Sequence, residues 1–281
     1  MRHIELKPLD GIRFSDRYGP WAVIAGASDG TGAAFAEQLA AMGLKLVLIA
    51  RRENALRALG ERLQNEHGTE FRVIVADLTS HDAADLIVQA TADIDVGLYI
   101  SNAGVVGSPA DFLDMPIAQS FALIQMNVTN FVTAVHGFGH RFRNRGKGGI
   151  IVMASVSALG GQPMHACYSG SKAFQMLFAE SLWAELRDQG VDIISIAAPP
   201  MDTPTVRRAR KDQELNLRYY FVAGEVVHEA LARLGTDPTV IFPDFGSRGE
   251  AAELERARRA RLEGAIGWAK MSKPSLAKTQ D

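Results

Sequence analysis

The sequence predicts a single α/β domain in which helices cover both faces of a doubly wound parallel sheet of six to seven strands. Short apolar runs that suit buried strands alternate with longer helical patterns, which is typical of parallel sheets. The first apolar run leads directly into a glycine-rich turn and a helix. The chain of 281 residues is long enough for one such domain with a large core.

Seven runs rich in branched aliphatic residues are expected to be strands, at residues 21–25, 44–50, 71–75, 96–100, 150–154, 191–197 and 239–242. Helices are expected from the glycine-rich turn through residue 42 and then at residues 53–67, 117–143, 166–189, 225–234 and 250–269. Gly43 and Gly190 suit the carboxyl ends of two of these helices. We expect Gly137 and Gly139 to break the helix at 117–143.

We expect three parts along the chain. Residues 1–20 are predicted to be an N-terminal extension wrapped on the surface, because they mix Pro and Gly with polar residues. Residues 21–245 form the main domain, with a mobile lid at about 200–222. Residues 246–281 are predicted to be a charged helix followed by a frayed tail.

Composition excludes several classes of protein. Apolar residues make up 47% of the chain and charged residues 22%, as in ordinary globular domains. A net charge of −2 gives no electrostatic reason to expect nucleic acid as a partner. The single cysteine, Cys167, excludes an internal disulfide and a Cys-based metal cluster, and we expect no metal site. No apolar run approaches the ~20 residues of a membrane helix and no signal-peptide core is present, so we expect a cytoplasmic protein.

The glycine-rich turn follows the first predicted strand and opens the first predicted helix. Gly26 allows a tight turn, Gly30 allows close backbone approach, and Gly32 lets the helix pack near the strand. The exposed N–H groups and the helix dipole favour a phosphate there. A glycine cluster alone would be weak support, but the strand–turn–helix context strengthens the prediction of a nucleotide site. The candidate cofactor-binding residues of this turn are Gly26, Ser28, Gly30, Thr31 and Gly32.

The end of the second predicted strand indicates which dinucleotide binds. A fold that uses NAD offers an acid here for the ribose 2′-hydroxyl, whereas this chain has Ala50 followed by Arg51 and Arg52. Two guanidinium groups suit a 2′-phosphate, because Arg matches phosphate in a bidentate fork. The sequence therefore favours NADP(H) over NAD(H). The alternative is that the arginine pair only begins the solvated helix at 53–67.

Two further strand ends carry candidate cofactor residues. Asp77 and Leu78 follow the third predicted strand, and the carboxylate either accepts from an adenine amine or caps the next helix. Asn102, Ala103 and Gly104 follow the fourth strand, where small residues leave room for a flat ligand or form an ordinary turn. Ligands of open α/β sheets bind at these carboxyl ends.

Ser155, Tyr168 and Lys172 are the candidate reactive residues. Tyr168 and Lys172 are four residues apart on a predicted helix and therefore share a face, while Ser155 ends a predicted strand. A free tyrosine has a pKa of ~10, and an ammonium ~4 Å away in a partly desolvated site would lower it by about three units. We therefore expect Tyr168 to exchange protons with a carbonyl or alcohol oxygen near pH 7. The alternative is a half-buried core tyrosine beside a solvated lysine.

These motifs resemble the short-chain dehydrogenase/reductase family, in its shorter, non-extended branch. The resemblance spans residues 21 to about 205 and implies a single-domain Rossmann fold. It implies an NADP(H)-dependent oxidoreductase that transfers hydride between nicotinamide and a ketone, an aldehyde or a secondary alcohol. It also implies a homodimer or homotetramer that packs through the helices carrying Asn127 and Tyr168.

The resemblance also implies individual roles. Tyr168 would be the acid/base, Ser155 would hold the substrate, and Asn127 would hold a relay water. Lys172 would bind the nicotinamide ribose and lower the pKa of the phenol, while Thr203 would meet the nicotinamide carboxamide. The chain departs from the family pattern at Ala25, Thr31, Ser101 and Pro199–Pro200.

Three alternatives stay open. A non-catalytic NADP(H)-binding regulatory or scaffold protein would use the same fold. An epimerase or dehydratase would keep the four catalytic candidates but usually needs a larger substrate domain. These candidates are Asn127, Ser155, Tyr168 and Lys172. A basic run within the predicted lid is either a solvated helix face or a site for an anionic substrate, and its members are Arg207, Arg208, Arg210 and Lys211.

Overall fold

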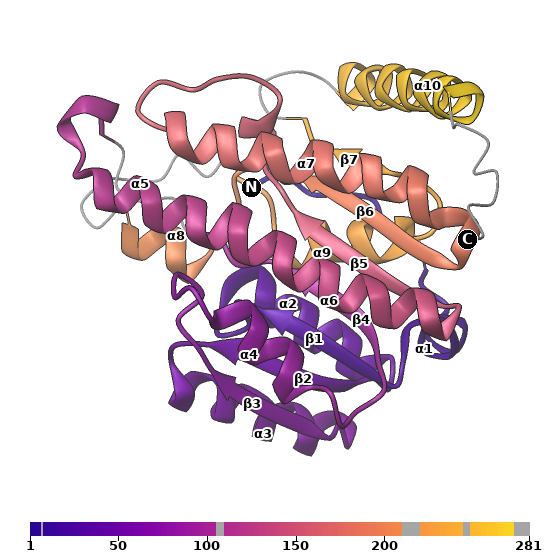
Figure 1. The fold of residues 1–281 in the computed structure, drawn as a ribbon. Helices are drawn as coiled ribbons and strands as arrows, with labels where there is room; N and C mark the ends of the chain where they lie inside the picture. Colours follow the sequence, from indigo (N-terminus) through magenta and orange to yellow (C-terminus); the bar gives the residue numbers. More distant parts are fainter. Residues whose placement is uncertain (7, 105–109, 210–219, 244–247, 273–281) are drawn as a thin grey trace, which may run out of the picture.

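The computed structural model describes residues 1–6, 8–104, 110–209, 220–243 and 248–272. Seven strands form one parallel sheet in the order β3-β2-β1-β4-β5-β6-β7 (Figure 1). The strands are β1 (Trp21–Ala25), β2 (Lys45–Ala50), β3 (Phe71–Val75), β4 (Val96–Ser101), β5 (Gly148–Met153), β6 (Val191–Ala197) and β7 (Thr239–Ile241). The predicted doubly wound parallel sheet is thereby confirmed, and strand order reverses between β1 and β4.

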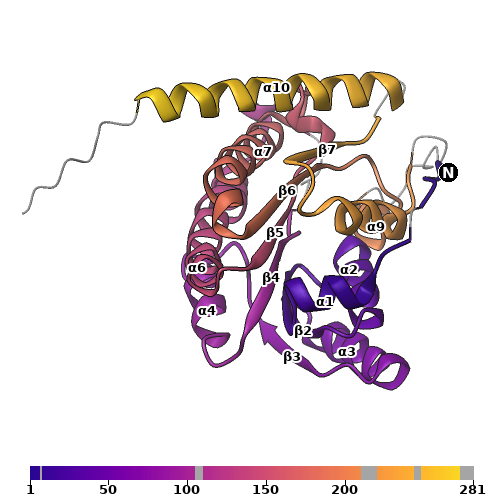
Figure 2. The same cartoon turned by 90° about the vertical axis from the view of Figure 1, so that its right-hand side faces the viewer.

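Helices cover both faces of the sheet (Figure 2). One face carries α1 (Gly11–Tyr18), α2 (Gly30–Ala41), α3 (Glu53–His67) and α9 (Ala223–Arg233). The other face carries α4 (Ala83–Ala90), α6 (Asn130–Arg145) and α7 (Ala166–Leu186). Successive β1 side chains alternate between the two apolar cores, so Ile24 faces one core and Val23 the other. This burial on both faces explains why the strands appear in the sequence as continuous apolar runs.

The remaining elements are short, apart from the C-terminal helix. They are the 3₁₀ turns η1 (Phe112–Asp114), η3 (Val156–Ala158) and η4 (Arg187–Gln189), the helices α5 (Ile117–Ile124), α8 (Pro204–Ala209) and α10 (Arg248–Ser272), and the π-helical turn η2 (Gln125–Thr129). The patterns gave no bounds for α1, α4 or α8. No helix in the described part of the chain is long and apolar enough to span a membrane.

The expectation that Gly137 and Gly139 break the helix at 117–143 is wrong. Both glycines lie inside α6, and the interruption is the π-helical turn η2, ten residues earlier. A Cβ at Gly137 would lie 2.8 Å from the Val88 side chain, so this glycine lets α6 pack closely on α4. Single π turns within helices often occur at functional sites, and this one contains Asn127.

The N-terminal segment packs into the main domain over part of its length. Helix α1 begins after Asp10, whose carboxylate caps it by accepting from the Arg13 N–H. Phe14 and Tyr18 of α1 are buried in the core. The Tyr18 hydroxyl donates to Asp192 over 2.8 Å. The predicted division of the chain at residue 20 stays a prediction.

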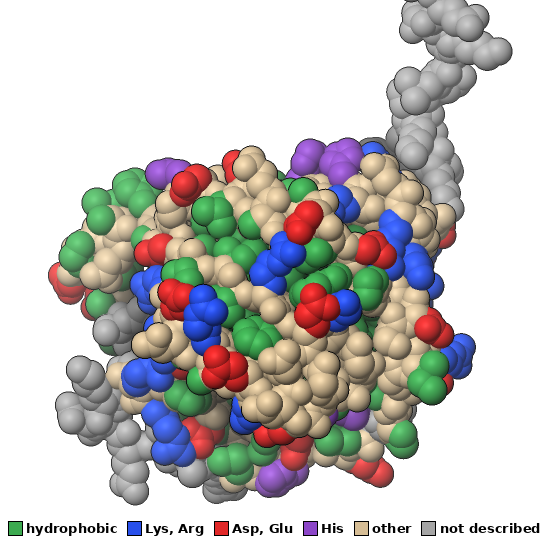
Figure 3. All heavy atoms as spheres, turned by 90° about the horizontal axis from the view of Figure 1, so that it is seen from below, with side chains coloured by type: hydrophobic (Ala, Val, Ile, Leu, Met, Phe, Trp, Pro, Cys, Tyr) green, Lys and Arg blue, Asp and Glu red, His purple; other side chains and the backbone are tan. Residues whose placement is uncertain are grey.

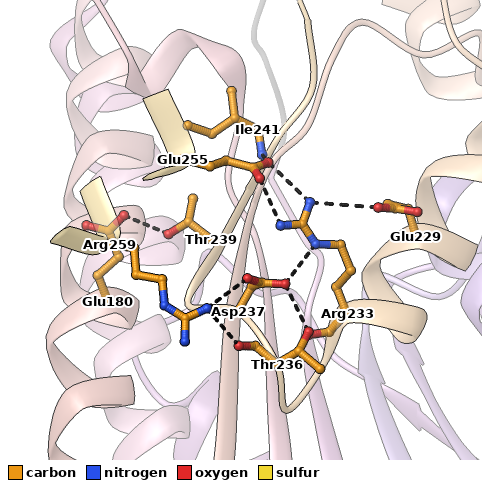
Figure 4. Close-up of polar contacts among 9 residues, drawn as sticks. All are labelled: Glu180, Glu229, Arg233, Thr236, Asp237, Thr239, Ile241, Glu255 and Arg259. Atoms are coloured by element: carbon orange, nitrogen blue, oxygen red, sulfur yellow. Dashed lines mark hydrogen bonds and ion pairs between the residues drawn. The ribbon is translucent and has the colours of Figure 1, made fainter. Parts of the chain in front are cut away.

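A network of ion pairs attaches α10 to the rest of the domain (Figure 4). Glu255 of α10 accepts from Arg233 of α9 and also, over 2.6 Å, from the main-chain N–H of Ile241 on the edge strand β7. Glu180 of α7 accepts from the Thr239 hydroxyl over 2.6 Å and from both ends of the Arg258 guanidinium. The Glu255 carboxylate therefore accepts from an edge-strand N–H that would otherwise be exposed.

The surface seen in Figure 3 mixes charges of both signs, with Lys and Arg side chains interspersed among Asp and Glu side chains. Exposed ion pairs of the described residues include Arg57–Glu53 and Arg62–Glu37. Such pairs contribute about 0–1 kcal/mol each, so this surface has little effect on the stability of the fold.

Replacing Glu180 tests the attachment of α10. Glu180→Ala leaves the Arg258 guanidinium and the Thr239 hydroxyl without their buried partner. We expect the free energy of unfolding, measured with urea, to fall by about 2 kcal/mol, which is less than for a fully buried pair. The Arg258 side chain is 22% exposed, which explains the reduction. The control Arg57→Ala removes an exposed pair and should change stability by about 0.5 kcal/mol or less. Equal losses in both variants would contradict this assignment.

Candidate active site

The carboxyl ends of β1, β4, β5 and β6 bring most of the predicted site residues together. The glycine turn follows β1, and its main chain lies against the turn that follows β4. Asn102 donates from its side-chain amide to the Gly26 carbonyl over 3.0 Å. Gly26 has a φ of +84°, and a Cβ there would lie 3.0 Å from the Ala103 Cα. Backbone conformation and lack of space both require glycine at this position.

Two more positions of the turn leave little space for a side chain. A Cβ at Gly32 would lie 2.0 Å from the Gly26 carbonyl oxygen, so the start of α2 packs directly on the turn. Gly30 has a φ of +58°, and a Cβ there would lie 3.1 Å from the Thr203 side chain. Thr203 is buried and accepts at its hydroxyl from the Val206 N–H over 3.3 Å. The structure therefore places Thr203 beside the glycine turn.

Lys172 lies in the interior at the end of β5 and is 2% exposed. Its ammonium donates to the Met153 carbonyl over 2.8 Å and to the Gln175 side-chain oxygen over 2.9 Å. A Cβ at Gly104 would lie 2.6 Å from the Lys172 Nζ, so glycine makes room for the lysine. Burial lowers the pKa of Lys172 to about 7, because the charged form loses its hydration.

Tyr168 and Ser155 face each other at the same strand end. Ser155 ends the run of β5, and its hydroxyl accepts from the Ser157 N–H over 3.2 Å, which begins η3. Removal from water raises the pKa of Tyr168, and a hydrogen bond with Ser155 opposes this rise. The tyrosine and the serine therefore lie near each other at this strand end, as the predicted shared oxygen requires.

The expectation that Lys172 lowers the pKa of Tyr168 is wrong for this structure. The Lys172 Nζ lies 6.0 Å from the centre of the Tyr168 ring, and its N–H groups point to Met153 and Gln175. Desolvation is the larger effect on both groups, and it favours a neutral phenol and a neutral amine. The calculation from sequence assumed a partly desolvated site, whereas both groups are removed from water.

Asn127 lies in the π-helical turn η2 and is completely buried. Its amide N–H donates to the Ser171 hydroxyl over 3.0 Å, and Ser171 in turn donates to the Tyr168 carbonyl over 2.8 Å. The side-chain oxygen of Asn127 has no partner among the described residues. A buried acceptor without a partner is costly, so it is suited to accept from a ligand or a water.

The two arginines after β2, Arg51 and Arg52, lie near different carboxylates. Both are exposed, and Arg52 donates to the Ser28 hydroxyl over 2.9 Å and to the carboxylate of Asp29. Hydrogen bonds from Thr79, and then the charge of Arg51, lower the pKa of Asp77. Asp77 also accepts from the Thr79 N–H over 3.0 Å, which is a local turn contact. Arg51, Arg52 and Asp77 therefore lie along the same rim as the glycine turn.

Asp29 was not predicted to have a role, and it connects the glycine turn to α8. Its carboxylate accepts from Arg208 and, over 2.8 Å, from the Thr205 hydroxyl, both of α8. Burial alone would raise the pKa of Asp29, but the hydrogen bonds from Arg208, Thr205 and Arg52 lower it. The signal was available in the sequence, since an acid is unusual in a turn that binds phosphate.

In the part of the predicted lid that the structure describes, the arginines of the basic run form ion pairs with acidic side chains. Arg207 forms two hydrogen bonds with Asp202, and Arg208 binds Asp29. Arg210 and Lys211 lie outside the described residues. Phe221 near the end of the predicted lid is buried, with 2% exposure, and pairs through its main chain with Met201. The described parts of residues 200–222 therefore contact the domain.

These residues fit a nicotinamide dinucleotide. Three glycines, at which a Cβ would lie 3.1 Å or less from its nearest neighbour, keep the turn thin, as close approach of a pyrophosphate requires. The Asn127 oxygen without a partner and the buried Lys172 ammonium lie at the neighbouring strand end. A parallel sheet with this turn beside its switch point, and with Ser155, Tyr168 and Lys172 next to it, defines a dinucleotide-dependent oxidoreductase.

Comparison with known proteins identifies the family. The model of the family described as short chain dehydrogenase matches residues 20–214, so the chain belongs to this family and is a hydride-transfer oxidoreductase. A 7beta-hydroxysteroid dehydrogenase of Mediterraneibacter gnavus is 30% identical over 84% of this chain and 90% of its own length. The predicted family, fold class and enzyme class are confirmed.

Two solved structures share the fold over nearly the whole chain. A short-chain dehydrogenase from Sphingobium yanoikuyae in complex with NADPH is 27% identical, with a TM-score of 0.75, covering 94% of this chain and 99% of that one. The bulky-bulky ketone specific alcohol dehydrogenase from Comamonas testosteroni is 26% identical, with a TM-score of 0.72, covering 93% and 97%.

Proposed function

We propose that this enzyme interconverts a bulky, largely apolar ketone and its secondary alcohol with NADP(H), and that Tyr168 is the acid/base. The observation that carries the proposal is that the buried Lys172 ammonium lies 6.0 Å from the centre of the Tyr168 ring, with Ser155 at the same strand end. A nicotinamide cofactor supplies or accepts the hydride when it is bound. Tyr168 gives its phenolic proton to the carbonyl oxygen in reduction and takes it back from the alcohol in oxidation.

The other residues prepare this proton transfer. Ser155 donates a hydrogen bond to the same substrate oxygen and fixes its direction toward Tyr168. Lys172 binds the nicotinamide ribose and returns a proton to Tyr168. The free oxygen of Asn127 holds a water that connects Lys172 to solvent. Thr203, beside Gly30, binds the carboxamide of the nicotinamide. The predicted cytoplasmic location stays a prediction.

A bulky substrate is supported by the segment between Ser155 and Tyr168. Leu159 and Met164 of this segment are 37% and 48% exposed, so apolar side chains of the segment are available to a substrate. Met164 also has a φ of +63°, which is uncommon for a residue other than glycine and often marks a functional loop. The relatives named for a hydroxysteroid and for bulky ketones point to the same substrate size.

Preference for NADP(H) over NAD(H) is supported by the rim after β2. Arg51 and Arg52 are exposed there, and the chain has Ala50 where a carboxylate would bind a ribose 2′-hydroxyl. A guanidinium matches the geometry and charge of a 2′-phosphate. The NADPH complex of the Sphingobium yanoikuyae relative agrees with this preference.

A homodimer or homotetramer is supported by the apolar surface of two helices. The exposed apolar side chains of α5 include Ile117 and Phe121, which are 56% and 62% exposed. On α7, Phe174 and Leu177 are 38% and 55% exposed. A cluster of large exposed apolar side chains often marks an interface between protein chains.

Replacing Tyr168 tests the mechanism. Tyr168→Phe keeps the ring and removes the proton donor, so we expect kcat for NADPH-dependent carbonyl reduction to fall by about 10²–10⁴. The Kd for NADPH, measured by fluorescence titration, should change little. Tyr18→Phe is the matched control, because Tyr18 bonds to Asp192 at the opposite end of the sheet. Wild-type rates in Tyr168→Phe across a panel of bulky ketones would refute the mechanism.

Replacing Arg51 tests the cofactor preference. Arg51→Ala removes a guanidinium from the rim, so the Kd for NADPH should rise by roughly tenfold or more, as for a lost charge-assisted contact. The Kd for NADH should stay within about twofold, because NADH has no 2′-phosphate. Arg57→Ala, which removes an exposed arginine of α3, should change neither value. An equal change for both cofactors in Arg51→Ala would contradict the assignment.

A charge on α5 tests the assembly. Phe121→Glu places a carboxylate in the proposed interface, where its desolvation opposes association. Light scattering after size exclusion should show a multimer for the wild type and a monomer for this variant. Ile12→Glu changes an equally apolar residue of α1 that is 77% exposed, and its assembly should match the wild type. A wild-type monomer at micromolar concentration would exclude the proposed assembly.

A further inference from the structure

Gln175 is a buried polar residue that the proposed mechanism does not use. It lies three residues after Lys172 on α7 and is 1% exposed. Its side-chain oxygen accepts from the Lys172 ammonium over 2.9 Å. Glutamine is seldom fully buried, and a buried amide next to a buried ammonium calls for a physical reason.

We propose that Gln175 is a positioning residue for Lys172, which fixes the direction of the ammonium group and helps to keep it protonated in the cofactor site. The proposal rests on the proposed function, in which Lys172 binds the nicotinamide ribose. It adds a residue to the site that acts through Lys172 and touches neither substrate nor cofactor.

The geometry of the ammonium supports this role. An ammonium group has three N–H donors in a tetrahedral arrangement. Gln175 and the Met153 carbonyl accept two of them, over 2.9 and 2.8 Å. Because the two acceptors hold the Lys172 ammonium in place, the direction of its third N–H is set as well. A lysine with one acceptor would keep the freedom to rotate about the remaining contact.

The electrostatics support it too. Burial disfavours the charged form of Lys172 and lowers its pKa to about 7. Hydrogen bonds to neutral acceptors favour the charged form and oppose this effect. Gln175 is the one side-chain acceptor of Lys172 among the described residues. Without it, the carbonyl of Met153 would be the remaining acceptor from the protein.

Among the described residues, no other charged group on the elements that pack on α7 stabilises the protonated form of Lys172. The elements packed on α7 around Lys172 are α5, η2, β5 and η3, and none of them contains an ionisable side chain. On α7 itself, Tyr168 is the ionisable neighbour, with its ring centre 6.0 Å from the Nζ. The acid of β6, Asp192, lies on the opposite face of the sheet and accepts from Arg17 and Tyr18 of α1. Arg258 of α10 faces α7 and pairs there with Glu180.

The test compares two substitutions of Gln175 in the full chain. Gln175→Met keeps the size and removes the acceptor, and Gln175→Glu keeps an acceptor and adds a negative charge. Gln38→Met is the matched control, because Gln38 is half-buried and donates to the Gly224 carbonyl on the opposite face of the sheet. The Lys172 pKa is followed by NMR of lysine labelled with 13C at Cε, and the Lys172→Met variant assigns its resonance.

In the cofactor-free protein, we expect Gln175→Met to lower the Lys172 protonation constant at least tenfold, Gln175→Glu to raise it, and Gln38→Met to leave it unchanged. The folded pKa of Lys172 lies below that of an unfolded lysine, so stability rises with pH between the two values. This rise should begin at lower pH in Gln175→Met and at higher pH in Gln175→Glu. The alkaline loss of kcat/KM should shift in the same directions.

Equal protonation constants in Gln175→Met and Gln38→Met would overturn the proposal. If Gln175→Met does not fold, the Gln175→Glu variant provides the test. A Lys172 pKa that does not rise in Gln175→Glu also overturns the proposal. A shifted pKa in an enzyme that reduces no carbonyl compound would leave the positioning role in place and refute the proposed function instead. The two failures are therefore distinguishable.

Discussion

The burial of one ammonium group is the constraint on which the site depends. Lys172 is 2% exposed, and an isolated charge at that depth would lose its proton unless acceptors surround it. The end of β5 offers the Met153 carbonyl, and the next turn of α7 offers Gln175. The turn after β4 makes room through Gly104. Three elements that are distant in the sequence therefore meet around one nitrogen atom.

The same requirement for close approach governs the cofactor side of the site. Gly26 faces Ala103, Gly30 faces Thr203, and Gly32 lies on the Gly26 carbonyl, each with little or no space for a Cβ. The turns after β1, β4 and β6 thus touch through main chain and small side chains. A thin rim of this kind lets a phosphate approach the main-chain N–H groups and the helix dipole closely. Larger side chains would hold the phosphate away.

Local patterns predicted the scaffold, and non-local contacts decided the rest. The strands 71–75 and 191–197 and the helix 53–67 match their predicted bounds, because each is a continuous apolar or amphipathic segment. The break in the helix at 117–143 was placed at glycines, since helix propensity contains no information on how α6 packs against Val88. The pKa of Tyr168 was predicted in the wrong direction, because the sequence does not give depth of burial.

The acid in the glycine-rich turn, Asp29, is explained by its partners. Asp29 is the N-cap residue of α2 but does not cap it, because its carboxylate is bound by Arg52 and by Arg208 and Thr205 of α8. Two guanidinium groups offset its charge, so the positive field of the α2 N-terminus remains available to an anion. These pairs also join the segment after β6 to the turn after β1, at the carboxyl-end rim of the sheet. Since the arginines are about half exposed, each pair contributes about 0–1 kcal/mol, and the connection opens at little cost.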